Sequence, residues 1–136
     1  MKTWCGLVVV GLGLLLAPPR VAPAESGGAS LLQYCLAAIE AFEGKALTPQ
    51  TASNAAFCSG HITGMLDMHA MAIRVKGMPP PFCVPDSMDV IQAIRVVVRY
   101  LQSHPEDLHL DGSALAALAL RDAFPCRPGA PEPRRR

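Results

Sequence analysis

Cysteines are the residues of this chain whose chemistry is most easily named. The chain has five cysteines. The first, Cys5, lies ahead of an apolar N-terminal run, and the other four are Cys35, Cys58, Cys83 and Cys126. No Cys-x-x-Cys pair occurs, so the spacing does not favour a redox-active dithiol. An even number of cysteines in an exported domain is typical of structural disulfides. We therefore expect two disulfide bonds among the last four cysteines.

A segment rich in methionine and histidine could bind a soft metal ion. Thioether and imidazole groups suit Cu(I), and the residues concerned are Met65, Met68, His69 and Met71, with Met78 nearby. Most of them also share one helical stripe, and such a stripe is more often core packing by an adaptable side chain. The favoured interpretation is packing without a bound metal or cofactor, and periplasmic copper binding is the alternative.

Motifs of enzymatic chemistry do not occur. The sequence lacks Gly-x-Ser-x-Gly, a phosphate-binding glycine loop and His-Glu-x-x-His. Its four histidines are too scattered to be assigned as bases, and the last residue before Pro105, His104, is a plausible helix end. The sequence therefore predicts a protein that is not an enzyme and has no catalytic residues.

The N-terminus has the pattern of an export signal. Lys2 precedes an apolar run from Gly6 to Ala17, and small residues follow at Ala22 and Ala24. The run is too short to cross a bilayer as a helix. Residues 1–24 are therefore predicted to be a cleaved secretory signal peptide, and the protein to be periplasmic without stable membrane insertion. A single membrane anchor is the alternative.

Charge argues against polyanionic partners. Without Lys2 and Arg20, ten basic and eleven acidic residues remain, a net charge of −1. Four arginines lie in the Pro- and Arg-rich segment 127–136, which is predicted to be a disordered tail, so residues 25–126 carry a net charge of −4. An acidic domain disfavours nucleic acid and anionic membranes and favours a basic partner.

Hydrophobic periodicity predicts four helices and no strand. Ser30 with Gln33 indicates the start of a helix over 31–43, and Thr48 with Pro49 the start of one that reaches about Val75. A third helix, capped by Asp86, ends before Pro105. A short fourth helix begins after Asp111 and ends at Pro125. We expect an all-α domain made of two helical hairpins.

Helical rise predicts the disulfide pairing. Cys35 and Cys58 lie about equally far from the first turn, roughly 12 to 15 Å along their helices, so they should face each other. Cys83 precedes the third helix and Cys126 follows the fourth, so the ends of the second hairpin bring them together. The predicted pairs are Cys35–Cys58 and Cys83–Cys126. Because each bond lowers the entropy of the unfolded chain, Cys35–Cys58 should stabilise the fold by about 3.4 kcal/mol and Cys83–Cys126 by about 4 kcal/mol.

Two helices carry features beyond simple core packing. Gly60 and Gly64 remove side chains from one stripe of the second helix, which predicts the close approach of another backbone. On the third helix, Val96 and Tyr100 widen the apolar face beyond what one partner helix covers. That helix is either central in the fold or part of a homodimer interface through Val96 and Tyr100.

The ordered motifs resemble the Tai and Rap immunity proteins of type VI secretion. The resemblance covers about residues 31–126 and depends on four strings: Cys58-x-Gly60-x-Ile62-x-Gly64, Phe82-Cys83-x-Pro85, Val97-Val98-x-Tyr100-Leu101-x-x-His104-Pro105-Glu106 and Ala119-Leu120-x-x-Ala123-Phe124-Pro125-Cys126. His61 departs from the pattern, which has an aromatic residue there. The resemblance implies a small helical periplasmic protein, often dimeric, that binds and blocks a cell-wall amidase toxin.

Two segments are candidates for contact with such a toxin. The first is the proline-stiffened segment with Lys76, Met78, Pro80 and Phe82, which could project into the amidase cleft. The second is the acidic turn with Glu106 and Asp107, which could meet a basic rim. A plain connection and a solvated turn are the structural alternatives. An acid-stress chaperone or a saposin-like lipid carrier also fits four disulfide-bonded helices.

Overall fold

The computed structural model describes residues 27–75 and 77–126. The predicted signal peptide 1–24, the predicted tail 127–136 and Lys76 lie outside these residues. Within them the elements are α1 (Gly28–Phe42), α2 (Pro49–Ala72), α3 (Val90–Ser103), the short 3₁₀ helix η1 (Pro105–Asp107) and α4 (Gly112–Ala123). The described residues contain no strand, and only Gly27 and Asp111 form an isolated bridge. The prediction of an all-α, four-helix domain is confirmed.

Side-chain caps define three of the helix starts. The Thr48 hydroxyl accepts from the Thr51 N–H, 3.2 Å away, and one Asp111 carboxylate oxygen accepts from the Ala114 N–H at 2.9 Å, so both predicted caps are confirmed. The cap of α3 is Asp89, which accepts from the Gln92 N–H at 2.8 Å. The prediction of Asp86 was wrong by one turn, because the chain from Pro85 to Met88 forms a turn of its own before the helix.

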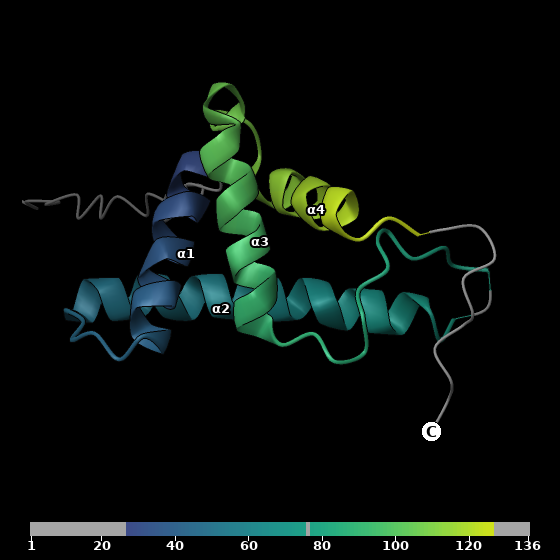
Figure 1. Cartoon of the computed structure of the whole chain (residues 1–136), viewed down its shortest axis with the longest axis horizontal. Coiled ribbons are helices and arrows are strands. Elements are labelled where there is room, and N and C mark those ends of the chain that lie inside the picture. Colours follow the sequence, from purple (N-terminus) through teal and green to yellow (C-terminus); the bar gives the residue numbers. More distant parts are fainter. Residues whose placement is uncertain (1–26, 76, 127–136) are drawn as a thin grey trace, which may run out of the picture.

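Figure 1 shows how the helices are arranged. α1 and α3 lie side by side and run in opposite directions, and α2 crosses both of them, so the helices of the first hairpin cross instead of lying parallel. α4 packs on α3 and touches α1. The core between them is built from apolar residues of all four helices and from Phe82 of the 73–89 connection.

Both predicted disulfides are confirmed. Cys35–Cys58 joins α1 to α2 across a Cα–Cα distance of 5.1 Å, and both residues are fully buried. Cys83–Cys126 joins the connection before α3 to the chain after α4, with a Cα–Cα distance of 4.9 Å. The Cys83 N–H also donates to the Phe124 carbonyl at 2.8 Å, so the second disulfide lies beside a backbone hydrogen bond.

The first turn of α1 is capped by distant backbone. The Gly28 N–H donates to the Leu110 carbonyl at 2.9 Å, and the Ala29 N–H donates to the Leu108 carbonyl at 3.0 Å. These bonds satisfy two of the four N–H groups that an α-helix leaves without an internal partner. The helix therefore starts at Gly28, and the prediction that Ser30 caps it was wrong.

Gly60 and Gly64 do not pack against another helix of the domain. Outside their own helix, no atom of the described chain lies within 4 Å of the position that a Cβ would take at either residue. The prediction of close backbone packing inside the domain was therefore wrong. Within the described residues this stripe of α2 faces solvent.

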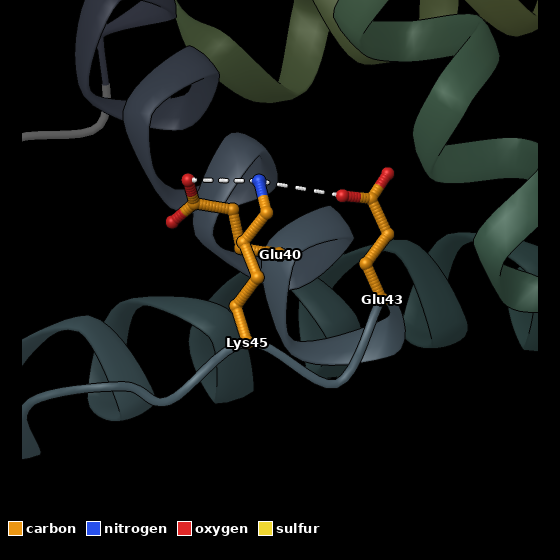
Figure 2. Close-up of polar contacts among 3 residues, drawn as sticks. All are labelled: Glu40, Glu43 and Lys45. Carbon is orange, nitrogen blue, oxygen red and sulfur yellow. Dashed lines mark ion pairs between the residues drawn. The ribbon is translucent and has the colours of Figure 1, made fainter.

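The connection between α1 and α2 is closed by a left-handed glycine and a small charge cluster. Gly44 has a φ of +75°, which a residue with a side chain rarely adopts. Figure 2 shows the Lys45 ammonium between two carboxylates, 3.5 Å from Glu40 and 3.3 Å from Glu43. The hydrogen bond to Glu43 and the charge of Glu40 raise the pKa of Lys45. All three side chains are solvated, so the cluster orients the turn more than it stabilises the fold.

No helix among the described residues is long and apolar enough to span a bilayer.

We expect the two disulfides to differ in resistance to reductant. Cys126 is exposed and Cys83 half-buried, whereas Cys35 and Cys58 have 0% exposure, so a mild reductant should open Cys83–Cys126 first. Stepwise reduction, alkylation of the free thiols and peptide mapping measure the order. Loss of both bonds at the same reductant concentration would contradict it.

Replacement of Gly28 by alanine should destabilise the domain. Its methyl group would overlap the Leu115 side chain and lie 3.2 Å from the Leu108 backbone, an overpacking that costs about 1–3 kcal/mol. This exceeds the gain of at most about 1 kcal/mol that alanine brings to a helix. Gly27→Ala is the control, because its Cβ would meet atoms only at 3.8 Å. Denaturant unfolding compares the two, and equal stability would contradict the packing argument.

Candidate functional site

A groove lies between α3 and α4. Its volume is about 290 Å³. One wall is formed by α3 and the residue that follows it. The other wall is formed by the last turns of α4, where two alanines leave space. The lining residues are Val96, Arg99, Tyr100, Ser103, His104, Ala119, Asp122 and Ala123.

Hydrogen bonds fix the floor of this α3–α4 groove. The His104 ring stacks on Tyr100 with centroids 4.1 Å apart, and its Nδ1 donates to the Tyr100 carbonyl at 2.9 Å. This bond leaves His104 Nε2 as an acceptor. The Ser103 hydroxyl donates back to the Arg99 and Tyr100 carbonyls. His104 is the residue that ends α3, as the sequence predicted, and the same geometry places its ring in the groove.

Acidic groups surround the Tyr100 phenol. Burial is the main cause that raises the pKa of Tyr100, and the carboxylates of Asp122 and Asp107 raise it further. The phenol is therefore a hydrogen-bond donor at neutral pH. Two predicted sets therefore lie at the same end of α3: Val96 with Tyr100, and the acidic turn of Glu106 with Asp107, which follows α3 directly.

The proline-rich segment belongs to the connection before α3 and reaches the end of α4, where the Pro80 carbonyl lies 3.9 Å from Cys126 Sγ. Met78 is exposed and Pro80 is half-buried, but the Phe82 side chain is 1% exposed and stacks on His69 with centroids 5.2 Å apart. Phe82 was expected to contact a partner, and in this structure its side chain belongs to the core. The reason is the His69 ring, which offers Phe82 an aromatic face inside the domain. Lys76, the remaining candidate, is not among the described residues.

The methionine and histidine segment is split by the fold. Met65 is half-buried against the core and His69 is buried, whereas Met68 and Met71 are exposed. The described residues contain no group of three or more His, Cys, Asp or Glu side chains arranged to hold a metal ion. Met65 and His69 therefore turn towards the core, whereas Met68 and Met71 face outward.

A smaller hollow of about 30 Å³ lies where α1, α2 and α4 meet. Phe57 packs edge-on against Tyr34 and stacks on His61, at centroid distances of 5.2 and 5.9 Å. His61 therefore occupies the position of an aromatic ring, which explains how it replaces the aromatic residue expected there. The Nε2 atom of His61 has no hydrogen-bond partner in the described chain.

Comparison with known families agrees with this architecture. The family model of the Rap1a immunity proteins matches residues 27–126, which is the whole described domain. The chain belongs to the Rap1a immunity protein family. No curated protein matches the sequence. Membership of the Rap1a family indicates an immunity protein that binds a secreted toxin protein, in a family that is generally not enzymatic.

Sequence reasoning found only part of the α3–α4 groove. Val96 and Tyr100 were recognised because they lie outside the narrow polar arc of α3. Arg99 belongs to that arc, and Asp122 gave no separate signal. A usable signal that was missed is the pair of small residues Ala119 and Ala123, one helical turn apart, which lower the wall of α4 opposite Tyr100.

We expect acid to weaken the contact between His69 and Phe82. Burial lowers the pKa of His69, while the nearby Phe82 backbone and the Asp86 carboxylate act in the opposite direction. The unfolded chain therefore binds a proton near pH 6.5, whereas the folded chain stays neutral until a lower pH. The contribution of neutral His69 to the free energy of unfolding is fully present above about pH 6.5. It is lost as the pH falls from there towards the lower pKa that His69 has in the folded chain.

Thermal unfolding between pH 7.5 and 5 tests this expectation. His69→Leu should flatten the pH dependence relative to the wild type, because it removes the buried titrating group. His109→Gln is the control, since His109 is exposed and should leave the slope unchanged. Equal slopes for wild type and His69→Leu would contradict the assignment.

Proposed function

We propose that this protein is a periplasmic immunity protein of type VI secretion that neutralises a peptidoglycan amidase by covering its cleft. The observation that carries the proposal is the match of the Rap1a family model to the entire described domain. Export through the signal peptide 1–24 and the amidase as target belong to the proposal.

The proposed toxin-binding surface is the α3–α4 groove together with η1. This groove combines apolar surface with hydrogen-bonding groups, supplied by Arg99, Tyr100 and His104. Such a combination is typical of the residues that dominate binding energy. Glu106 is exposed beside them and Asp107 half-buried, so this rim is suited to basic side chains of the toxin. Met78 and Pro80 belong to the connection before α3. The Pro80 carbonyl lies 3.9 Å from Cys126 Sγ, just beyond the end of α4, so the two residues form a second contact if the toxin extends past α4.

Rigidity supports this function. A surface held by two disulfides and capped helices loses little conformational entropy on binding, so most of the contact energy becomes affinity. Self-association through Val96 and Tyr100 would cover the same groove. We therefore assign these residues to the toxin and not to a homodimer.

Charge reversal on η1 tests the proposed surface. Glu106→Lys should weaken binding to the cognate amidase toxin by at least about tenfold, about 1.4 kcal/mol, because a basic rim of the toxin would meet a like charge. Calorimetry measures the affinity, and survival of cells that express the toxin in the periplasm measures protection. Glu43→Lys is the control, since it changes the net charge equally on an exposed turn elsewhere.

Two outcomes would contradict the proposal at different levels. Equal affinities for Glu106→Lys, Tyr100→Ala and wild type would remove the groove as the binding surface but keep the function. No binding by the wild type, and no protection of cells that carry the amidase, would remove the amidase as the target.

A further inference from the structure

The α3–α4 groove has the size and the apolar walls of a pocket for one long side chain. Its volume of about 290 Å³ is close to the lower limit of about 300 Å³ for small-molecule sites. Val96 forms an apolar wall on α3, and Ala119 and Ala123 form one on α4. An apolar stem can therefore lie between the two helices and remove these walls from water.

Two hydrogen-bond acceptors of the groove have no strong partner in the described chain. His104 donates through Nδ1 to the Tyr100 carbonyl at 2.9 Å, so its Nε2 atom is left to accept. The Asp122 carboxylate lies 4.0 Å from Arg121 Nε, and both side chains are more than half exposed. Exposed ion pairs of this length contribute little, so the carboxylate is available to a stronger donor.

The charges around the groove favour a cation. Burial is the main cause that raises the pKa of Tyr100, and the Asp122 and Asp107 carboxylates act next, ahead of the opposing charge of Arg121. Arg99 lines the groove but is exposed, and it is not among the charges that shift this pKa, so its guanidinium lies away from the phenol. The potential at the phenol is therefore negative.

We propose that the α3–α4 groove binds one arginine side chain of a partner protein. The methylene stem lies along Val96 and the alanines of α4, and the guanidinium donates to the Asp122 carboxylate and to His104 Nε2. A planar guanidinium carries several N–H donors and serves two acceptors at once, whereas a lysine ammonium is a compact point charge.

Aromatic stacking also favours arginine over lysine. The Tyr100 and His104 rings lie together in the groove, with centroids 4.1 Å apart, and a guanidinium stacks on flat rings. As a statement about the toxin, the proposal rests on the proposed function, because it names the side chain that the immunity protein would recognise. The pocket itself is a property of this chain and can be tested without a toxin.

NMR titration of the isotope-labelled protein with N-acetyl-arginine amide tests the pocket. Saturable shifts should appear at the backbone amides of Tyr100, His104 and Ala123. N-acetyl-citrulline amide has nearly the same shape without the charge, and it should bind at least about tenfold more weakly because its bonds to the acceptors are not charge-assisted. N-acetyl-lysine amide, with the side-chain ammonium free, should also bind more weakly than the arginine derivative.

Two variants separate the polar and the apolar parts of the pocket. Asp122→Asn should weaken binding of the arginine derivative about fivefold, because the hydrogen bond to a charged acceptor is lost. Ala123→Leu should abolish binding, since it fills the groove from an exposed position of α4. The matched controls are Glu43→Gln, which removes a carboxylate on an exposed turn, and Ala114→Leu, an exposed alanine of α4 outside the groove. Circular dichroism confirms that each variant is folded.

Three results would overturn the proposal: no saturable shift at the groove, equal binding of the arginine and citrulline derivatives, or binding that Ala123→Leu leaves unchanged. Affinity for the amidase is measured separately, so the two proposals fail independently. A groove that binds the arginine derivative in a protein that binds no amidase would keep the pocket and remove the proposed function. Amidase binding without binding of the arginine derivative would remove only the pocket.

Discussion

The bond between Cys35 and Cys58 is the constraint on which the rest of the domain depends. α2 crosses α1 in this structure, and both half-cystines of the bond lie fully buried at that crossing. Several of the buried side chains around it are alanines, which supply little hydrophobic free energy. A covalent bond at the crossing holds α1 and α2 in place, and α3 can then pack against both of them.

The proposed binding surface follows from this arrangement. α3 is buried on one side by Ile94, Val97 and Leu101, which turns Tyr100 and Arg99 towards α4. The small residues of α4 keep its backbone near α3 without filling the space above it. The groove therefore forms because a strongly amphipathic helix lies beside an alanine-rich helix. Its polar groups come from the C-terminal parts of both helices.

Local chemistry explains which features the sequence could predict. Thr48 and Asp111 cap their helices through bonds to residues three positions away, and the disulfide pairing follows from helical rise. The start of α1 could not be predicted, because its caps are the carbonyls of Leu108 and Leu110, some eighty residues away. Asp86 and Asp89 are equally good caps in isolation. The burial of Phe82 depends on His69 of another element, and the exposure of Gly60 and Gly64 depends on which faces of α2 the other helices leave uncovered.

The two disulfides also have a consequence for how the protein is made. Each joins cysteines that are consecutive in the described domain, Cys35 with Cys58 and Cys83 with Cys126. A chain that emerges N-terminus first and is oxidised in the order of emergence therefore reaches its native pairing without reshuffling, a step that otherwise takes seconds to hours. Oxidation in that order reaches the native pairing without a disulfide isomerase.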